Sequence, residues 1–142
     1  MRLTAFTDFG LRVLMRLAGS PDRVVTTEAL ARELAVSRHH LTKVVRALAA
    51  AGYVSTTRGA GGGFRLACPA RAITVGAVVR QLEGHRALVE CFREDGGACS
   101  LVPCCRLRGH LARAREAFVA ELEQVTIADC ASPPVLDMAE AS

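Results

Sequence analysis

The sequence has few aromatic residues: it lacks tryptophan and has one tyrosine and five phenylalanines among 142 residues. A hydrophobic core must therefore consist mainly of aliphatic side chains, which the 51% hydrophobic content can supply. No apolar run reaches the roughly 18 residues that a membrane-spanning helix needs. Asp8 and Arg12 interrupt the apolar N-terminal segment, which predicts an amphipathic helix and not a secretory signal. We therefore expect a cytoplasmic protein without a membrane partner.

Motifs of the common enzyme classes are also missing. The sequence has no nucleophile elbow, no pair of catalytic carboxylates in a motif and no phosphate-binding GxxxxGK(S/T). Its one glycine-rich stretch, residues 58–63, lies between two expected strands, whereas a nucleotide-binding loop joins a strand to a helix. We do not expect an enzyme.

Charge is unevenly distributed along the chain. The first 65 residues contain ten Arg or Lys and four Asp or Glu, whereas the remainder contains eight and ten. A basic first half suggests a polyanionic partner, usually a nucleic acid. Surface lysines and arginines are common, so charge alone leaves an ordinary solvated surface open.

Periodicity predicts a mainly α-helical chain with one small β-hairpin. The expected helices cover residues 4–18, 26–34, 37–51 and 75–83, with a long one from Pro103, and the expected strands cover 53–57 and 64–66. Residues 85–102 show no regular pattern. Two helices joined by a three-residue turn and followed by a hairpin are typical of a winged helix-turn-helix. Ala31 at the helix crossing and Ala35 in the turn agree with this fold.

The second helix of that unit carries a polar outer face. Its residues there are Arg38, His39, His40, Thr42, Lys43 and Arg46. A helix in the major groove of DNA reads base edges with such side chains. Ser37 and the amides at the helix start suit a phosphate group. The alternative is a solvated polar face on a helical bundle.

The hairpin loop has almost no side chains. Arg58 is followed by glycines at positions 59, 61, 62 and 63, namely Gly59, Gly61, Gly62 and Gly63. Such a loop lets the backbone approach DNA and leaves Arg58 able to enter a minor groove. A merely flexible hairpin tip is the alternative.

The long final helix has an apolar stripe, and nothing after it is expected to cover that stripe. The stripe consists of Leu107, Leu111, Ala114, Phe118, Leu122 and Val125. We expect a homodimer formed through this helix, with packing onto the chain's own winged domain as the alternative. The expected division is a winged helix-turn-helix DNA-binding domain at 1–84, a loop at 85–102, a dimerisation helix at 103–130 and a tail at 131–142.

Six cysteines occur, and four of them lie within fifteen residues. They are Cys68, Cys91, Cys99, Cys104, Cys105 and Cys130. In a reducing cytoplasm such a cluster indicates metal binding or redox chemistry. The intervals between Cys91, Cys99 and Cys105 are not those of a zinc ribbon, and wide spacing in a glycine-containing loop suits an iron–sulfur cluster. Spacing alone leaves a zinc site and unliganded cysteines open.

Five segments follow one another in a recognisable order. They are FTDFGLRVL (6–14), VSRHHLTKVVRALAAAGYV (36–54), RGAGGGFRL (58–66), VECFREDGGACSLVPCCRL (89–107) and VTIADC (125–130). Together they resemble the NsrR branch of the iron–sulfur winged-helix regulators, a family that also contains IscR. The resemblance covers residues 1–131, and its TDFG, RGxGGG and CxLxPxCRL motifs are specific.

The resemblance implies a set of cluster ligands. Cys91, Cys99 and Cys105 match the three cluster cysteines, and Asp8 matches a fourth ligand that comes from the partner subunit. Cys104 stands where relatives can have alanine. Arg108 occupies the position of the histidine ligand of IscR, which argues against the IscR arrangement.

The function that the resemblance implies is a nitric-oxide-sensing repressor. It would bind palindromic operator DNA as a homodimer while its cluster is intact, and release DNA when the cluster is nitrosylated or lost. One 4Fe–4S cluster per subunit is expected, with a 2Fe–2S cluster as the alternative. A regulator of the same family that senses iron–sulfur status, iron or redox state is the rival function. A zinc-binding structural module is the rival for the cysteine site.

Overall fold

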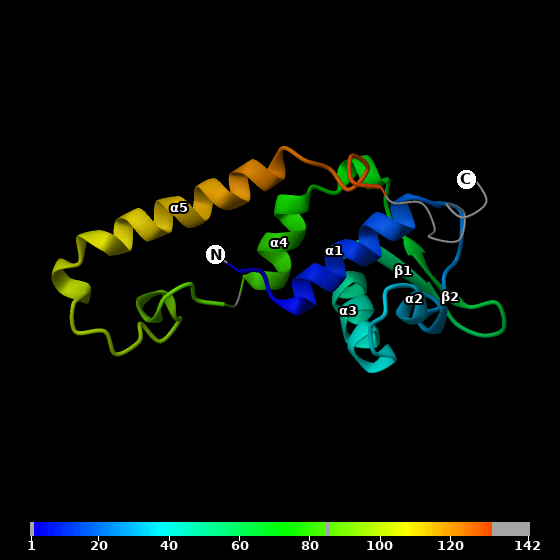
Figure 1. Cartoon of the computed structure of the whole chain (residues 1–142), viewed down its shortest axis with the longest axis horizontal. Coiled ribbons are helices and arrows are strands. Elements are labelled where there is room, and N and C mark those ends of the chain that lie inside the picture. Colours follow the sequence, from blue (N-terminus) through cyan, green and yellow to red (C-terminus); the bar gives the residue numbers. More distant parts are fainter. Residues whose placement is uncertain (1, 85, 132–142) are drawn as a thin grey trace.

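The computed structural model describes residues 2–84 and 86–131 as five helices, one hairpin and three short 3₁₀ turns (Figure 1). The elements are α1 (Ala5–Ala18), α2 (Thr27–Glu33), α3 (Arg38–Ala50), β1 (Val54–Thr57), β2 (Gly63–Leu66), η1 (Ala70–Ala72), α4 (Val75–Glu83), η2 (Glu90–Phe92), η3 (Val102–Cys104) and α5 (Arg106–Glu123). Residues 132–142 of the expected tail lie outside the described residues. The mainly α-helical fold with a hairpin wing is confirmed.

Helix α1 lies at the centre of the core, between α3 and α4 (Figure 1). Val13, Leu14 and Leu17 on its inner face are fully or almost fully buried. Gly10 allows the close approach of α4, because a Cβ atom there would lie only 2.7 Å from Cδ1 of Leu82. The amphipathic pattern of the N-terminal segment thus reflects a helix whose apolar face packs against both α3 and α4.

The helix-turn-helix forms from local signals in the sequence. Thr26 and Ser37 cap α2 and α3, each accepting a hydrogen bond from a backbone amide three residues ahead. Ala35 has a φ of 53°, the left-handed conformation that turns the chain between the helices. Ala31 is buried at the crossing, and its carbonyl oxygen accepts from the amide of Val36. The expected roles of Ala31 and Ala35 are confirmed.

The wing is an antiparallel pair in which Val54 faces Leu66 and Thr57 faces Gly63. Phe64 points into the core with 2% exposure, while most of the other strand residues are exposed or half-buried. Val25, which precedes α2, adds an isolated antiparallel bridge to Phe64 through two backbone hydrogen bonds of 2.9 and 2.8 Å. This bridge attaches the wing to the start of the helix-turn-helix.

Helix α5 leaves the body of the molecule along most of its length, and its C-terminal end returns to α4 (Figure 1). Val119 is the buried residue on this helix. After the helix, the carbonyl of Val125 accepts from the amide of Val75, and the amide of Ile127 donates to the carbonyl of Ile73, each at 2.8 Å. Among the described residues, no helix is both long and apolar enough to cross a bilayer.

The start of the last helix differs from the prediction. Pro103 is the second residue of the 3₁₀ turn η3, and the extended Cys105, with a ψ of 105°, separates that turn from α5. The helix therefore begins at Arg106 and not at Pro103, and it ends at Glu123. Proline suits the first turn of a 3₁₀ helix as well as that of an α-helix, because neither turn needs its missing amide hydrogen.

The side-chain carboxylate of Glu83 connects the end of α4 to the start of α1. Oε1 of Glu83, the last residue of α4, accepts from the backbone amide of Thr4 at 2.7 Å and from the Thr4 hydroxyl at 2.8 Å. Burial raises the pKa of Glu83, but hydrogen bonds from Thr7 and Thr4 and the nearby Arg86 outweigh it, so the net pKa lies below the ordinary value. Glu83 is thus held as a carboxylate against the start of α1.

The contact of α5 with α4 depends on a glycine, which gives a testable prediction. A Cβ at Gly76 would lie 2.6 Å from the backbone nitrogen of Glu123 and 2.7 Å from the carbonyl oxygen of Val119. We expect Gly76→Ala to reduce the free energy of unfolding by about 1–3 kcal/mol, because the helices must separate. Gly109→Ala is the matched control in α5, where the nearest atom is Nη1 of Arg113 at 3.5 Å. It should be neutral or stabilise by up to about 1 kcal/mol. Urea unfolding measures both, and equal effects would contradict the packing.

Candidate nucleic-acid interface and cysteine loop

The two faces of α3 separate apolar from polar residues. Leu41, Val44, Val45 and Leu48 are buried on the inner face, as predicted. On the other face Arg38, His39, His40, Lys43 and Arg46 are all exposed. These five exposed side chains are called the outer face of α3 below.

Two polar residues at the start of α3 have roles in the helix itself. The Ser37 hydroxyl oxygen accepts from the His40 amide at 3.2 Å, and the Thr42 hydroxyl donates to the carbonyl oxygen of Arg38 at 2.8 Å. Thr42 is half-buried, unlike its basic neighbours. The structure therefore places Ser37 at the helix start, as expected, but turns Thr42 toward its own backbone.

The wing glycines are explained by the backbone. Gly59 and Gly61 have φ values of 95° and 75°, which glycine adopts readily. A Cβ at Gly62 or Gly63 would lie 2.5 Å from a carbonyl oxygen, that of Thr57 or Val25 respectively. Gly59, Gly61 and Gly62 thus suit the closure of the loop, and Gly63 suits the close approach of Val25. The basic character of the wing tip depends on the exposed Arg58.

Ion pairing distinguishes this surface from the remainder of the protein. Arg12, Arg16, Arg32, Arg80 and Arg93 each pair with a carboxylate. Across residues 2–84 and 86–131, no ion pair involves a basic side chain of α3 or of the wing loop. Their positive charge is thus directed toward solvent, where a polyanion can neutralise it.

The cysteine loop, residues 86–105, connects α4 to α5. Cys91 lies in η2, Cys99 lies just before η3, and Cys105 immediately precedes α5; all three are half-buried, whereas Cys104 is exposed. Among the described residues, no three His, Cys, Asp or Glu side chains are close enough together to hold a metal ion. The structure therefore gathers the three expected thiols in one loop but does not bring them into a closed ligand set.

The first part of this loop is closed on itself. Gly96 and Gly97 have positive φ values, and the Gly97 amide donates to Asp95 at 3.0 Å. The Ala98 amide donates to Glu90 at 3.1 Å. The Gly97 amide and the Arg93 guanidinium hold the pKa of Asp95 below its usual range. These bonds give residues 90–98 a defined turn with Cys91 on it.

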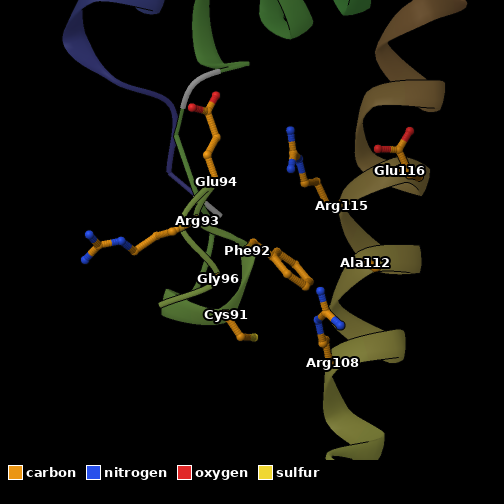
Figure 2. A pocket seen from close by; sticks show the side chains of 9 residues that line it. All are labelled: Cys91, Phe92, Arg93, Glu94, Gly96, Arg108, Ala112, Arg115 and Glu116. Atoms are coloured by element: carbon orange, nitrogen blue, oxygen red, sulfur yellow. The ribbon is translucent and has the colours of Figure 1, made fainter. Parts of the chain in front are cut away.

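A cavity of about 470 Å³ separates this turn from α5. Figure 2 shows the Arg108 side chain of α5 beside the ring of Phe92 and Arg115 projecting from α5 farther along the cavity, while Arg93 points away from the helix. Cys91 lies at the edge of the same cavity. Cys91 thus shares the cavity with basic side chains, and the loop's three half-buried thiols are soft donors. Thiolate donors and a basic surrounding fit an anionic iron–sulfur group in donor type and charge.

Asp8 lies on α1, away from the cysteine loop in sequence. Its carboxylate pairs with Arg12 one turn later, at 2.8 Å, and its side chain is 46% exposed. The Arg12 guanidinium also lies 6.0 Å from the centre of the Phe9 ring. Asp8 is thus accessible from outside its own chain.

The other two cysteines are half-buried, and neither lies in the cysteine loop. Cys68 packs against the core, as expected for a small apolar residue. Burial, and to a lesser extent the nearby Cys68, raise the pKa of Tyr53.

Sequence reasoning missed the contact between Glu83 and Thr4. These residues are 79 positions apart, and no local motif marks the pair. A signal was present for the turn at residues 90–98, because Asp-Gly-Gly is a turn sequence.

Comparisons with known proteins place the chain among transcriptional regulators. Residues 3–133 match the family model Rrf2, described as an iron-dependent transcriptional regulator. The chain is 44% identical over 130 residues to the HTH-type transcriptional regulator NsrR of Geobacillus kaustophilus, which covers 91% of this chain and 88% of that protein.

Solved structures show the same fold. The oxidized form of CymR from Staphylococcus aureus matches with a TM-score of 0.72 and 25% identity, over 93% of this chain and 97% of that one. IscR from T. potens matches with a TM-score of 0.70 and 24% identity, over 100% and 91%. With its family model spanning nearly the whole sequence, the chain belongs to the Rrf2 family of transcriptional regulators.

Proposed function

We propose that the protein is a nitric-oxide-sensing transcriptional repressor. It binds palindromic operator DNA in the cytoplasm as a homodimer while an iron–sulfur cluster is bound, and it releases DNA when the cluster is nitrosylated or lost. The observation that carries this proposal is the joint occurrence of an unpaired basic outer face on α3 and three half-buried thiols in one loop. The similarity to NsrR along nearly the whole chain supports it.

DNA contact is assigned to α3 and the wing. Arg38, His39 and His40 stand at the start of α3, where a helix docked in the major groove meets the base edges. Lys43 and Arg46 lie farther along the exposed face and suit phosphate contacts. Arg58 extends the same basic surface at the wing tip. Ser37 acts by capping α3, so that the amides at its start face the DNA backbone.

A homodimer is assigned to the part of α5 that leaves the body. Leu107 is 61% exposed, and Leu111, Phe118 and Leu122 are only half-buried in the single chain. The stripe ends at Val125, whose backbone carbonyl accepts from the amide of Val75 at the start of the chain's own α4. A second copy covering the exposed part would bury these apolar side chains and place two α3 helices for two half-sites.

The cluster ligands are assigned to Cys91, Cys99, Cys105 and Asp8 of the partner subunit. When bound, the cluster supplies iron that reacts with nitric oxide, most readily where the ligand is a carboxylate. The same Asp8 carboxylate is held by Arg12 in the single chain, so Arg12 fixes its side chain on the outer surface of α1. Because α1 packs on α3, a change in the position of Asp8 is transmitted to the DNA-contacting helix.

We expect the basic side chains to contribute separately to affinity. Lys43→Ala or Arg46→Ala should weaken operator binding and reduce the dependence of affinity on salt by about one counterion each. Arg113→Ala, on α5, is the control and should change neither quantity. Fluorescence anisotropy across a salt series measures both. Unchanged affinity in the α3 variants would contradict the assigned interface.

The two adjacent cysteines give a paired test of the ligand set. Cys105→Ala should abolish cluster binding because it removes a half-buried thiol at the base of α5, whereas Cys104→Ala, which removes an exposed thiol, should retain it. Iron and sulfide analysis of anaerobically purified protein, with its visible absorption spectrum, measures the outcome. Zinc without sulfide in the unaltered protein would exclude the sensor.

Asp8→Ala tests the ligand from the partner subunit. We expect a less stable cluster and weaker control of DNA binding by nitric oxide, because one iron loses its protein ligand. Asp22→Ala, an exposed acid outside α1, serves as the control. Anaerobic titration with nitric oxide, followed by absorption and anisotropy, measures both properties. If Asp8→Ala keeps both, the partner ligand is wrong; if iron or an oxidant releases DNA and nitric oxide does not, the rival signal holds.

A further inference from the structure

Glu83 occupies a position that joins two parts of the proposed sensor. It is the last residue of α4 and lies three positions before the first residue of the cysteine loop. Its Oε1 atom accepts both the amide and the hydroxyl of Thr4, which caps α1 one turn before Asp8. One carboxylate therefore connects the base of the loop to the helix that carries Asp8, within one chain.

The contact is built to hold the helix start. The Thr4 hydroxyl oxygen also accepts from the Thr7 amide at 3.2 Å, so Thr4 is fixed on both sides. Thr7 is fully buried and faces the same carboxylate. Hydrogen bonds to an ionised oxygen are stronger than those between neutral groups.

The C-terminal half of α5, the helix that follows the loop, is held on α4 as well. Arg80 on α4 pairs with Glu116 at 3.1 Å and with Glu123 at 3.2 Å, both on α5. These pairs are exposed and individually weak, but they lie beside the close contact at Gly76. The loop thus starts from α4 and leads into a helix whose C-terminal half is held on α4. Among the described residues, Glu83 is the α4 side chain that hydrogen-bonds to the start of α1.

We propose that Glu83 is a positioning residue that couples the two cysteine sites of a dimer. This rests on the proposed function, in which Asp8 of each subunit serves the partner's loop. In a symmetric dimer, a displacement of one loop acts through Glu83 on its own α1. That α1 carries the ligand for the other loop, so the second site is weakened when the first is lost. Loss from the two sites is then cooperative.

The first experiment counts clusters per dimer. Native mass spectrometry follows the full-length protein during stepwise addition of nitric oxide, in wild type, Glu83→Ala, Glu83→Gln and Glu123→Ala. In the wild type we expect dimers with one cluster to be scarcer than independent loss predicts. Loss of the first cluster should favour loss of the second by a coupling factor of at least about five. Glu83→Ala should show independent loss. Glu83→Gln keeps an oxygen acceptor for Thr4 and should restore much of the coupling.

Glu123→Ala removes a carboxylate of the α4–α5 pairing and should behave as the wild type. Independent loss in the wild type, or equal coupling in wild type and Glu83→Ala, would overturn the proposal. If the wild type binds no iron or sulfide, or if Asp8→Ala keeps wild-type cluster stability, the proposed function fails instead.

The second experiment needs no cluster. Hydrogen exchange of the metal-free protein reports on residues 2–10, whose first amides depend on Thr4 and Glu83. Glu83→Ala should accelerate exchange there by about fivefold or more, while Glu83→Gln and Glu123→Ala should not. Unchanged exchange in Glu83→Ala would also overturn the proposal. If Glu83→Ala does not fold, Glu83→Gln decides the outcome through the cluster count: coupling below that of the wild type supports the proposal, and coupling equal to that of the wild type contradicts it.

Discussion

The burial of α1 is the constraint on which the remaining structure depends. Val13, Leu14 and Leu17 fill the space between α3 and α4, and each buried aliphatic side chain of this size stabilises the fold by about 1.5–3 kcal/mol. Gly10 brings the backbone of α1 close to Leu82, with Leu48 and Val44 of α3 also nearby. Because protein interiors are close-packed, α1 cannot change position without moving α3 or α4. A displacement of α1 therefore also affects α3, which carries the exposed basic face.

Charge pairing divides the surface into two kinds of region. The ion pairs of the described residues lie on α1, α2, α4, α5 and the cysteine loop, where they join neighbouring turns or helices. The buried Arg16, paired with Glu33, links α1 to α2 in the same way. The basic residues of α3 and Arg58 lack such partners among the described residues. A surface of unpaired like charge repels itself, and bound polyanions relieve that repulsion.

The parts of the fold that sequence could predict are those set by local rules. The caps Thr26 and Ser37, the left-handed Ala35 and the apolar period of α3 each act within one or two turns, so the helix-turn-helix follows from the residues themselves. The bridge between Val25 and Phe64 was not predictable, because it joins residues far apart and has no motif. The start of α5 was placed too early because Pro103 suits both kinds of helical turn.

The cysteine site was predictable in composition but not in arrangement. Resemblance selects Cys91, Cys99 and Cys105 as ligands, and this selection stays a prediction. In the structure these three thiols are half-buried and Cys104 is exposed. Convergence of the thiols is a different matter. In the proposed site it depends on the conformation of a long loop and on a carboxylate that would come from the partner subunit. In the proposed dimer, the geometry of the cysteine site therefore depends on how the two chains pair. Asp8 lies one turn after Thr4, which Glu83 holds in the same subunit. The contact between Thr4 and Glu83 joins residues 79 positions apart and has no local sequence pattern, so it could not be predicted from the sequence.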